Sequence, residues 1–118
     1  MIHNDKSIKR KQQESIILKA IADLLHRLKS DIKSLNEVVV VRVDLSPDLS
    51  TLKVFLFSEA GKKVTEDVIE ELIPYCRSFR FSLGNMISFR RVPRVRFIYD
   101  SHYEKVLKIE KLIDSVKE

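Results

Sequence analysis

The sequence has little glycine, a single cysteine and no long apolar run. Its two glycines, Gly61 and Gly84, are too few for the glycine-rich loops that cradle the phosphates of nucleotide cofactors. Cys76 cannot form an internal disulfide, and its place in a helical apolar pattern is typical of a small buried hydrophobe. No apolar run approaches the roughly 18 residues that cross a bilayer, and no signal-peptide pattern opens the chain. We therefore expect a cytoplasmic protein that has no membrane partner.

The sequence also lacks the residue spacings of common catalytic and metal sites. His3, His26 and His102 are scattered along the chain, with neither a His-x-x-Glu-His motif nor paired cysteines. Cys76 would need a neighbouring base to act as a nucleophile, and no histidine is near it in the sequence. The sequence therefore predicts no metal, no cofactor and no enzymatic activity.

The charge of the chain is unevenly distributed. A length of 118 residues suits one domain (1–118), and an apolar fraction of 44% favours a packed globule. Residues 34–71 hold four basic and eight acidic side chains, whereas residues 72–100 hold six basic side chains and one acidic side chain, Asp100. All six basic residues are arginines, whose planar guanidinium group suits phosphate and stacks on bases. They are Arg77, Arg80, Arg90, Arg91, Arg94 and Arg96.

The first half of the chain is patterned as a helix followed by two strands. Apolar residues recur at three- and four-residue steps over 15–32, which predicts an amphipathic helix. The basic leader before it, which includes Lys9, Arg10 and Lys11, is expected to form a mobile arm over residues 1–12. Residues 38–45 and 52–57 read as strands, and the short turn between them favours an antiparallel hairpin.

The second half predicts a kinked helix, a third strand and a closing helix. Thr65, followed by acidic residues, has the features of a helix N-cap. Pro74 predicts a kink, after which helical spacing resumes and places Arg77, Arg80, Gly84, Ser88 and Arg91 on one cationic face. Residues 94–99 alternate as a strand with Arg94 and Arg96 on the same face. An amphipathic helix over 103–116 completes the order α-β-β-α-kink-α-β-α.

The arginines of the kinked helix and of the third strand are expected to meet in one RNA-binding patch. The competing interpretation is a solvated face that only confers solubility. Phe81 and Phe89 fall near the basic side, where a ring could stack on an unpaired base. We assign Phe89 to the core and leave Phe81 open between the core and the binding face.

Three segments carry a resemblance to a known family. Residues 79–84 (FRFSLG), 89–93 (FRRVP) and 97–100 (FIYD) together closely resemble the signature of bacterial ribosome-binding factor A, and the resemblance extends to the opening helix. It implies an α+β, KH-like fold of the second type, in which a three-stranded sheet packs against helices. This family lacks the Gly-x-x-Gly loop of standard KH domains and has a helix-kink-helix in its place. The sequence departs from the family pattern in two places. Tyr75, Cys76 and Arg77 stand at the kink, where smaller residues are usual, and Arg94 stands at a position that is commonly acidic.

The resemblance implies a monomeric factor that binds the immature small (30S) ribosomal subunit and its 16S rRNA. Such a factor assists late rRNA processing and subunit maturation, and the family is associated with cold adaptation. The alternative is a protein-interaction adaptor that pairs an exposed sheet edge with a partner strand. The candidate RNA-binding residues are Arg77, Arg80, Arg90, Arg91, Arg94 and Arg96, assisted by Lys9, Arg10 and Lys11.

Overall fold

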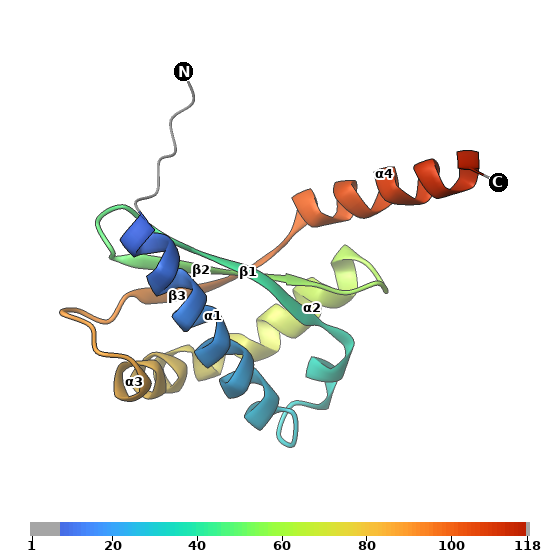
Figure 1. Ribbon diagram of the computed structural model, residues 1–118. Helices are drawn as coiled ribbons and strands as arrows, with labels where there is room; N and C mark the ends of the chain where they lie inside the picture. Colours follow the sequence, from blue (N-terminus) through green and yellow to red (C-terminus); the bar gives the residue numbers. More distant parts are fainter. Residues whose placement is uncertain (1–7, 118) are drawn as a thin grey trace.

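The computed structural model describes residues 8–117, in which three helices cover one face of a three-stranded sheet and the last helix extends beyond it (Figure 1). The predicted order of elements, with three strands and a kinked central helix, is confirmed. The elements are α1 (Ile8–Leu28), the 3-10 turn η1 (Lys33–Glu37), β1 (Val39–Leu45), β2 (Thr51–Phe57), α2 (Lys62–Leu72), the 3-10 turn η2 (Ile73–Tyr75), α3 (Cys76–Met86), β3 (Arg94–Tyr99) and α4 (Ser101–Lys117). Within residues 8–117 we find no helix long and apolar enough to span a membrane.

Helix α1 begins earlier than the sequence predicts. It starts at Ile8, so the prediction of a mobile arm is wrong for residues 8–12, while residues 1–7 lie outside the described residues. Lysine, arginine and glutamine have high helix propensity and extend the helix without apolar periodicity. A carboxylate oxygen of Glu14 also accepts a hydrogen bond from the backbone N–H of Leu45 at 2.6 Å. This contact attaches the start of α1 to the end of β1.

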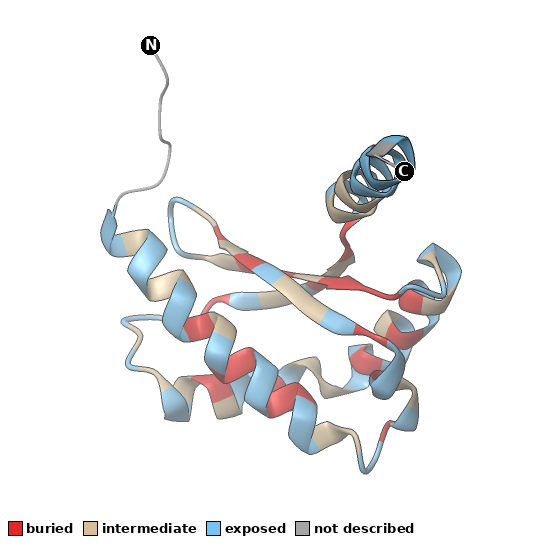
Figure 2. Cartoon of the chain, turned by 45° about the vertical axis from the view of Figure 1, so that its right-hand side comes forward, coloured by how far each residue is buried: buried red, intermediate tan, exposed pale blue. Residues whose placement is uncertain are grey.

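The sheet contains the predicted hairpin and adds β3 beside it. β1 and β2 are antiparallel, with an irregularity between Val40 and Arg42, and β3 runs parallel to β2. Side chains alternate between the two faces of each strand, so Leu52, Val54 and Leu56 are buried on the face that the helices cover. Lys53, paired with Arg96 in the register, lies on the opposite face, and within residues 8–117 no helix covers this part of it (Figure 2).

The turn between β1 and β2 is held by side-chain hydrogen bonds. Asp48 accepts hydrogen bonds from the backbone N–H of Ser50 and from the hydroxyls of Ser50 and Ser46, which lower the pKa of Asp48 to about 2. This network holds Leu49 in the left-handed region at a φ of 63°. The carbonyl of Ser50 accepts a hydrogen bond from the backbone N–H of Arg94 at 2.9 Å. The turn therefore fixes the point where β3 begins.

The central helix is kinked as predicted, but its start differs. α2 begins at Lys62, because Gly61 takes a φ of 111° and opens the helix. Thr65 is therefore not the N-cap; it is buried within the first turn, and its hydroxyl donates to the carbonyl of Gly61. The kink is the 3-10 turn η2, which contains Pro74. Cys76, just after it, is half-buried against the core, and burial raises the pKa of its thiol, in keeping with an apolar role.

Within residues 8–117, helix α4 packs on the rest of the fold near its start and not along its distal half. The ring of Tyr103 lies edge-on to that of Phe57, with centroids 5.0 Å apart, and Leu107 is half-buried. Beyond this point the helix projects away from the sheet (Figures 1 and 2). The amphipathic helix is confirmed, yet its distal apolar side chains are exposed: Ile109, Leu112, Ile113 and Val116.

Removal of residues 109–118 is expected to change the free energy of unfolding by less than about 0.5 kcal/mol, because the apolar side chains described there bury little surface. Urea denaturation of the shortened chain measures this difference. Leu72→Ala is the control, because Leu72 is fully buried and its truncation should cost about 3 kcal/mol. A loss above about 1 kcal/mol in the shortened chain would contradict the expectation.

Candidate nucleic-acid interface

The segment after α3 is a loop, which corrects the predicted helical face. α3 ends at Met86, and Ile87 takes an extended conformation, so Ser88 and Arg91 do not continue the helix. Pro93 favours an extended backbone at the residue before it. The chain also has to run back along α3, because β3 begins beside the turn between β1 and β2. Residues 87–93 therefore form a loop between α3 and β3 (Figure 1).

Two contacts hold this loop against α3. Gly84 allows close approach, because a Cβ atom at this position would lie 2.9 Å from Cγ2 of Val92. Arg80 donates two hydrogen bonds to the carbonyl of Val92, from Nη2 at 2.9 Å and from Nε at 3.3 Å. Arg80 therefore positions the loop in addition to being a candidate RNA contact.

Four of the predicted arginines lie together. A shallow hollow of about 470 Å³ is lined by Arg77, Arg80, Phe81, Gly84, Asn85 and Val92. A second, of about 390 Å³, is lined by Ser50, Thr51, Arg80, Arg91, Val92 and Arg94. Because the two hollows share Arg80 and Val92, they form one continuous area, which we call the arginine surface. Its cationic residues come from a helix, a loop and a strand: Arg77, Arg80, Arg91 and Arg94.

The other candidate residues lie outside the two hollows. Arg96 is on the uncovered face of the sheet, opposite Lys53 in the register, and Arg90 is exposed in the loop. The structure therefore brings together four of the six arginines instead of all six. Lys9, Arg10 and Lys11 lie on the first turn of α1, at the end of the molecule where the loop 87–93 also lies (Figure 1). Arg10 is half-buried, while Lys9 and Lys11 are exposed.

The arginines keep their charge largely uncompensated. The only acid of residues 72–100, Asp100, is 1% exposed and pairs with Arg42, whose Nε lies 3.0 Å from its Oδ2. Within residues 8–117, no hydrogen bond or ion pair engages the side chains of five of the six arginines, Arg80 being the exception. The local potential is therefore more positive than the net charge of the chain suggests.

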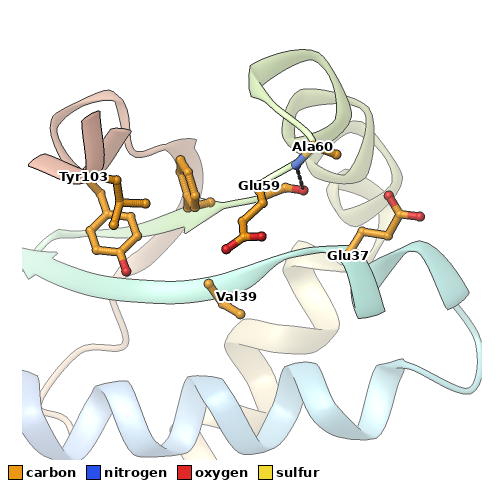
Figure 3. Close-up of a pocket in the computed structure, with 8 residues that line it drawn as sticks. Glu37, Val39, Glu59, Ala60 and Tyr103 are labelled. Atoms are coloured by element: carbon orange, nitrogen blue, oxygen red, sulfur yellow. Dashed lines mark hydrogen bonds between the residues drawn. The ribbon is translucent and has the colours of Figure 1, made fainter. Parts of the chain in front are cut away.

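A different hollow, of about 480 Å³, lies where β1 begins and β2 ends, next to α4 (Figure 3). Tyr103 borders one side of it, and Glu37 and Glu59 lie toward the other. Its two carboxylates disfavour phosphate, so the arginine surface is the better candidate for nucleic acid. Within residues 8–117, no three His, Cys, Asp or Glu side chains lie close enough together to hold a metal ion.

The chain is similar to known proteins over nearly its whole length. The family profile described as "Ribosome-binding factor A" matches residues 9–113, a range that includes all the candidate residues. A protein of the same description from Prochlorococcus marinus (strain MIT 9301) is 36% identical over 104 residues, covering 87% of this chain and 80% of that relative. The chain belongs to the ribosome-binding factor A family. The family resemblance read from the sequence is confirmed.

Solved structures of ribosome-binding factor A share the fold. The crystal structure of this factor from Thermus thermophilus matches with a TM-score of 0.66 and 25% identity, covering 75% of this chain and 93% of that one. A Thermotoga maritima protein solved by NMR matches with a TM-score of 0.67 and 23% identity, covering 75% of this chain and 83% of that one. The α+β, KH-like fold expected of a ribosome-binding factor A is thus confirmed.

Proposed function

We propose that the chain binds the immature small (30S) ribosomal subunit through its 16S rRNA and assists late rRNA processing and subunit maturation. It acts in the cytoplasm as a single monomeric domain and without catalysis. The observation that carries the proposal is the arginine surface, where Arg80 lies with three arginines whose guanidinium groups have no partner within residues 8–117, while the one acid of residues 72–100 is buried. Relatives named for ribosome binding support the ribosome as the partner.

The chemistry of the arginine surface suits a folded RNA. Each guanidinium presents a planar set of donors that can hold a phosphate through two hydrogen bonds. The loop carrying Arg91 is fixed to α3 through Gly84 and Arg80, so these donors are arranged before RNA arrives. Contacts to phosphate set position and orientation and carry no sequence information. The chain would therefore recognise the shape of a site on the subunit.

The double variant Arg77→Gln/Arg91→Gln is expected to bind small subunits about tenfold more weakly, because it removes two charge-assisted phosphate contacts. Co-sedimentation with immature small subunits measures the affinity. Arg80 is left intact, because its hydrogen bonds hold the loop. The matched control is Lys105→Gln/Lys111→Gln, which makes the same charge change at exposed positions on α4. Equal binding by both double variants would contradict the proposal.

The sheet-edge adaptor is the second candidate. β1 is an edge strand, and Val39 at its start is 60% exposed beside the hollow of Figure 3. Nuclease digestion of the bound subunit separates the two functions. Release of the chain by nuclease supports RNA binding, whereas retention on the remaining ribosomal proteins supports the adaptor.

A further inference from the structure

We propose that Phe81 is a stacking platform for an unpaired base of the RNA held on the arginine surface. This inference rests on the proposed function and adds the form of RNA that is bound. Phe81 is 72% exposed on α3, within the first hollow of the arginine surface. The chain has six phenylalanines and three tyrosines, all within residues 8–117, and the other eight rings are buried or half-buried.

Most of the other aromatic rings in the described structure contact another ring or a guanidinium group, and the remaining two, Tyr75 and Phe89, pack against the core. Phe79 lies edge-on to Phe97, with centroids 5.5 Å apart, and Phe57 contacts two tyrosine rings. The guanidinium of Arg42 lies 3.8 Å from the ring centroid of Phe55 and covers that ring. Within residues 8–117, Phe81 has neither a ring partner nor a guanidinium over it. Its π face is therefore open to a ligand.

The neighbours of Phe81 supply what a nucleotide needs besides stacking. Arg77 lies one turn before it and Asn85 one turn after it on the same side of α3, and both are exposed. Arg77 can hold a phosphate, and the amide of Asn85 can donate to and accept from the edge of a base. Gly84, three residues on, has no side chain to cover the ring.

An exposed Phe81 ring beside the arginines of the arginine surface favours unpaired RNA over a duplex. Bases inside an A-form helix are stacked on one another and cannot meet a protein ring, whereas bases in loops, bulges and ends can turn outward. A base of any identity offers a π face, so stacking tolerates many sequences. We therefore expect the arginine surface to prefer a single-stranded or bulged segment.

Tryptophan fluorescence can test this directly, because the chain contains no tryptophan. Phe81→Trp places a single fluorophore at the proposed platform, and a short single-stranded RNA of mixed sequence should quench it, whereas the same strand annealed to its complement should not. Leu112→Trp, at an exposed position on α4, is the control and should not respond to either RNA. Phe81→Leu should weaken binding of the single strand about tenfold and leave duplex binding unchanged.

The outcomes separate the platform from the arginine surface. If the wild-type chain binds RNA but Phe81→Leu binds the single strand equally tightly, the stacking platform is wrong and the proposed function stands. If Phe81→Leu weakens the binding of single strand and duplex equally, the platform is also wrong. The ring would then support the shape of the arginine surface and would not stack on a base. If the wild-type chain binds neither RNA, the stacking platform is overturned, whereas the proposed function is overturned by the co-sedimentation experiment with small subunits.

Discussion

Replacement of Arg42 by methionine is expected to lower the free energy of unfolding by about 3 kcal/mol at neutral pH. The Nε and Nη2 atoms of Arg42 donate to the two carboxylate oxygens of Asp100, at 3.0 and 3.5 Å. The Asp100 side chain is fully buried, so removal of the cation leaves a buried charge without its partner. We expect the low end of the range for broken buried pairs, because the Arg42 side chain is 45% exposed.

Urea denaturation of Arg42→Met, Asp100→Asn and the double variant tests this pairing. The double variant should lose less than the sum of the two single variants, because the two residues share one interaction. Arg27→Met is the control; its ion pair with Asp23 is exposed on both sides and should be worth less than about 1 kcal/mol. A stability of Arg42→Met within about 0.5 kcal/mol of the wild type would mean that the pair contributes little.

The pair also links the sheet to α4. Asp100 accepts a hydrogen bond from the backbone N–H of Tyr103 at 2.9 Å, as an N-cap residue does. One carboxylate thus joins β1, the end of β3 and the start of α4. Asp100 is the only acid of residues 72–100, and its burial keeps it away from the six arginines of that segment. Stability and charge distribution therefore depend on the same side chain.

The elements that the sequence predicted best are those set by local patterns. β3 follows from alternation over 94–99, and the hairpin follows from a short turn between two strand patterns. The kink follows from Pro74. The start of α1 was missed because its lysine and glutamine residues have helix propensity without apolar periodicity. The start of α2 depends on the backbone of Gly61, which no side-chain pattern reveals.

The site was predicted less completely because tertiary contacts determine it. In the sequence, Ser88 and Arg91 follow the helical spacing of α3 by coincidence. In the structure, α3 ends at Met86, and the loop runs back along the helix because Val92 packs closely on Gly84. Arg42 was missed because it lies 58 residues from Asp100. The sequence marks Asp100 as the single acid among the six arginines of residues 72–100, but this does not identify Arg42 as its partner.

The affinity of the chain for single-stranded RNA is expected to fall about 100-fold between about 50 mM and about 200 mM salt. Each guanidinium that neutralises a phosphate releases bound counterions, so the loss grows with the number of contacts. Five arginine side chains have no partner within residues 8–117, and five contacts predict a log–log slope of about −3.5. These residues are Arg77, Arg90, Arg91, Arg94 and Arg96.

Binding titrations over a series of potassium chloride concentrations measure this slope and show how many arginines contact phosphate. Arg77→Gln/Arg91→Gln should flatten the slope to about −2, because three contacts remain, whereas Lys105→Gln/Lys111→Gln should leave it unchanged.

A slope near zero in the wild-type chain would show that phosphate contacts do not drive binding. A wild-type slope of about −3 would instead fit the four arginines of the arginine surface, with Arg80 contacting phosphate while Arg90 and Arg96 remain in solvent. The slope therefore distinguishes a compact site formed by α3, its loop and the start of β3 from a wider one that includes Arg90 and Arg96.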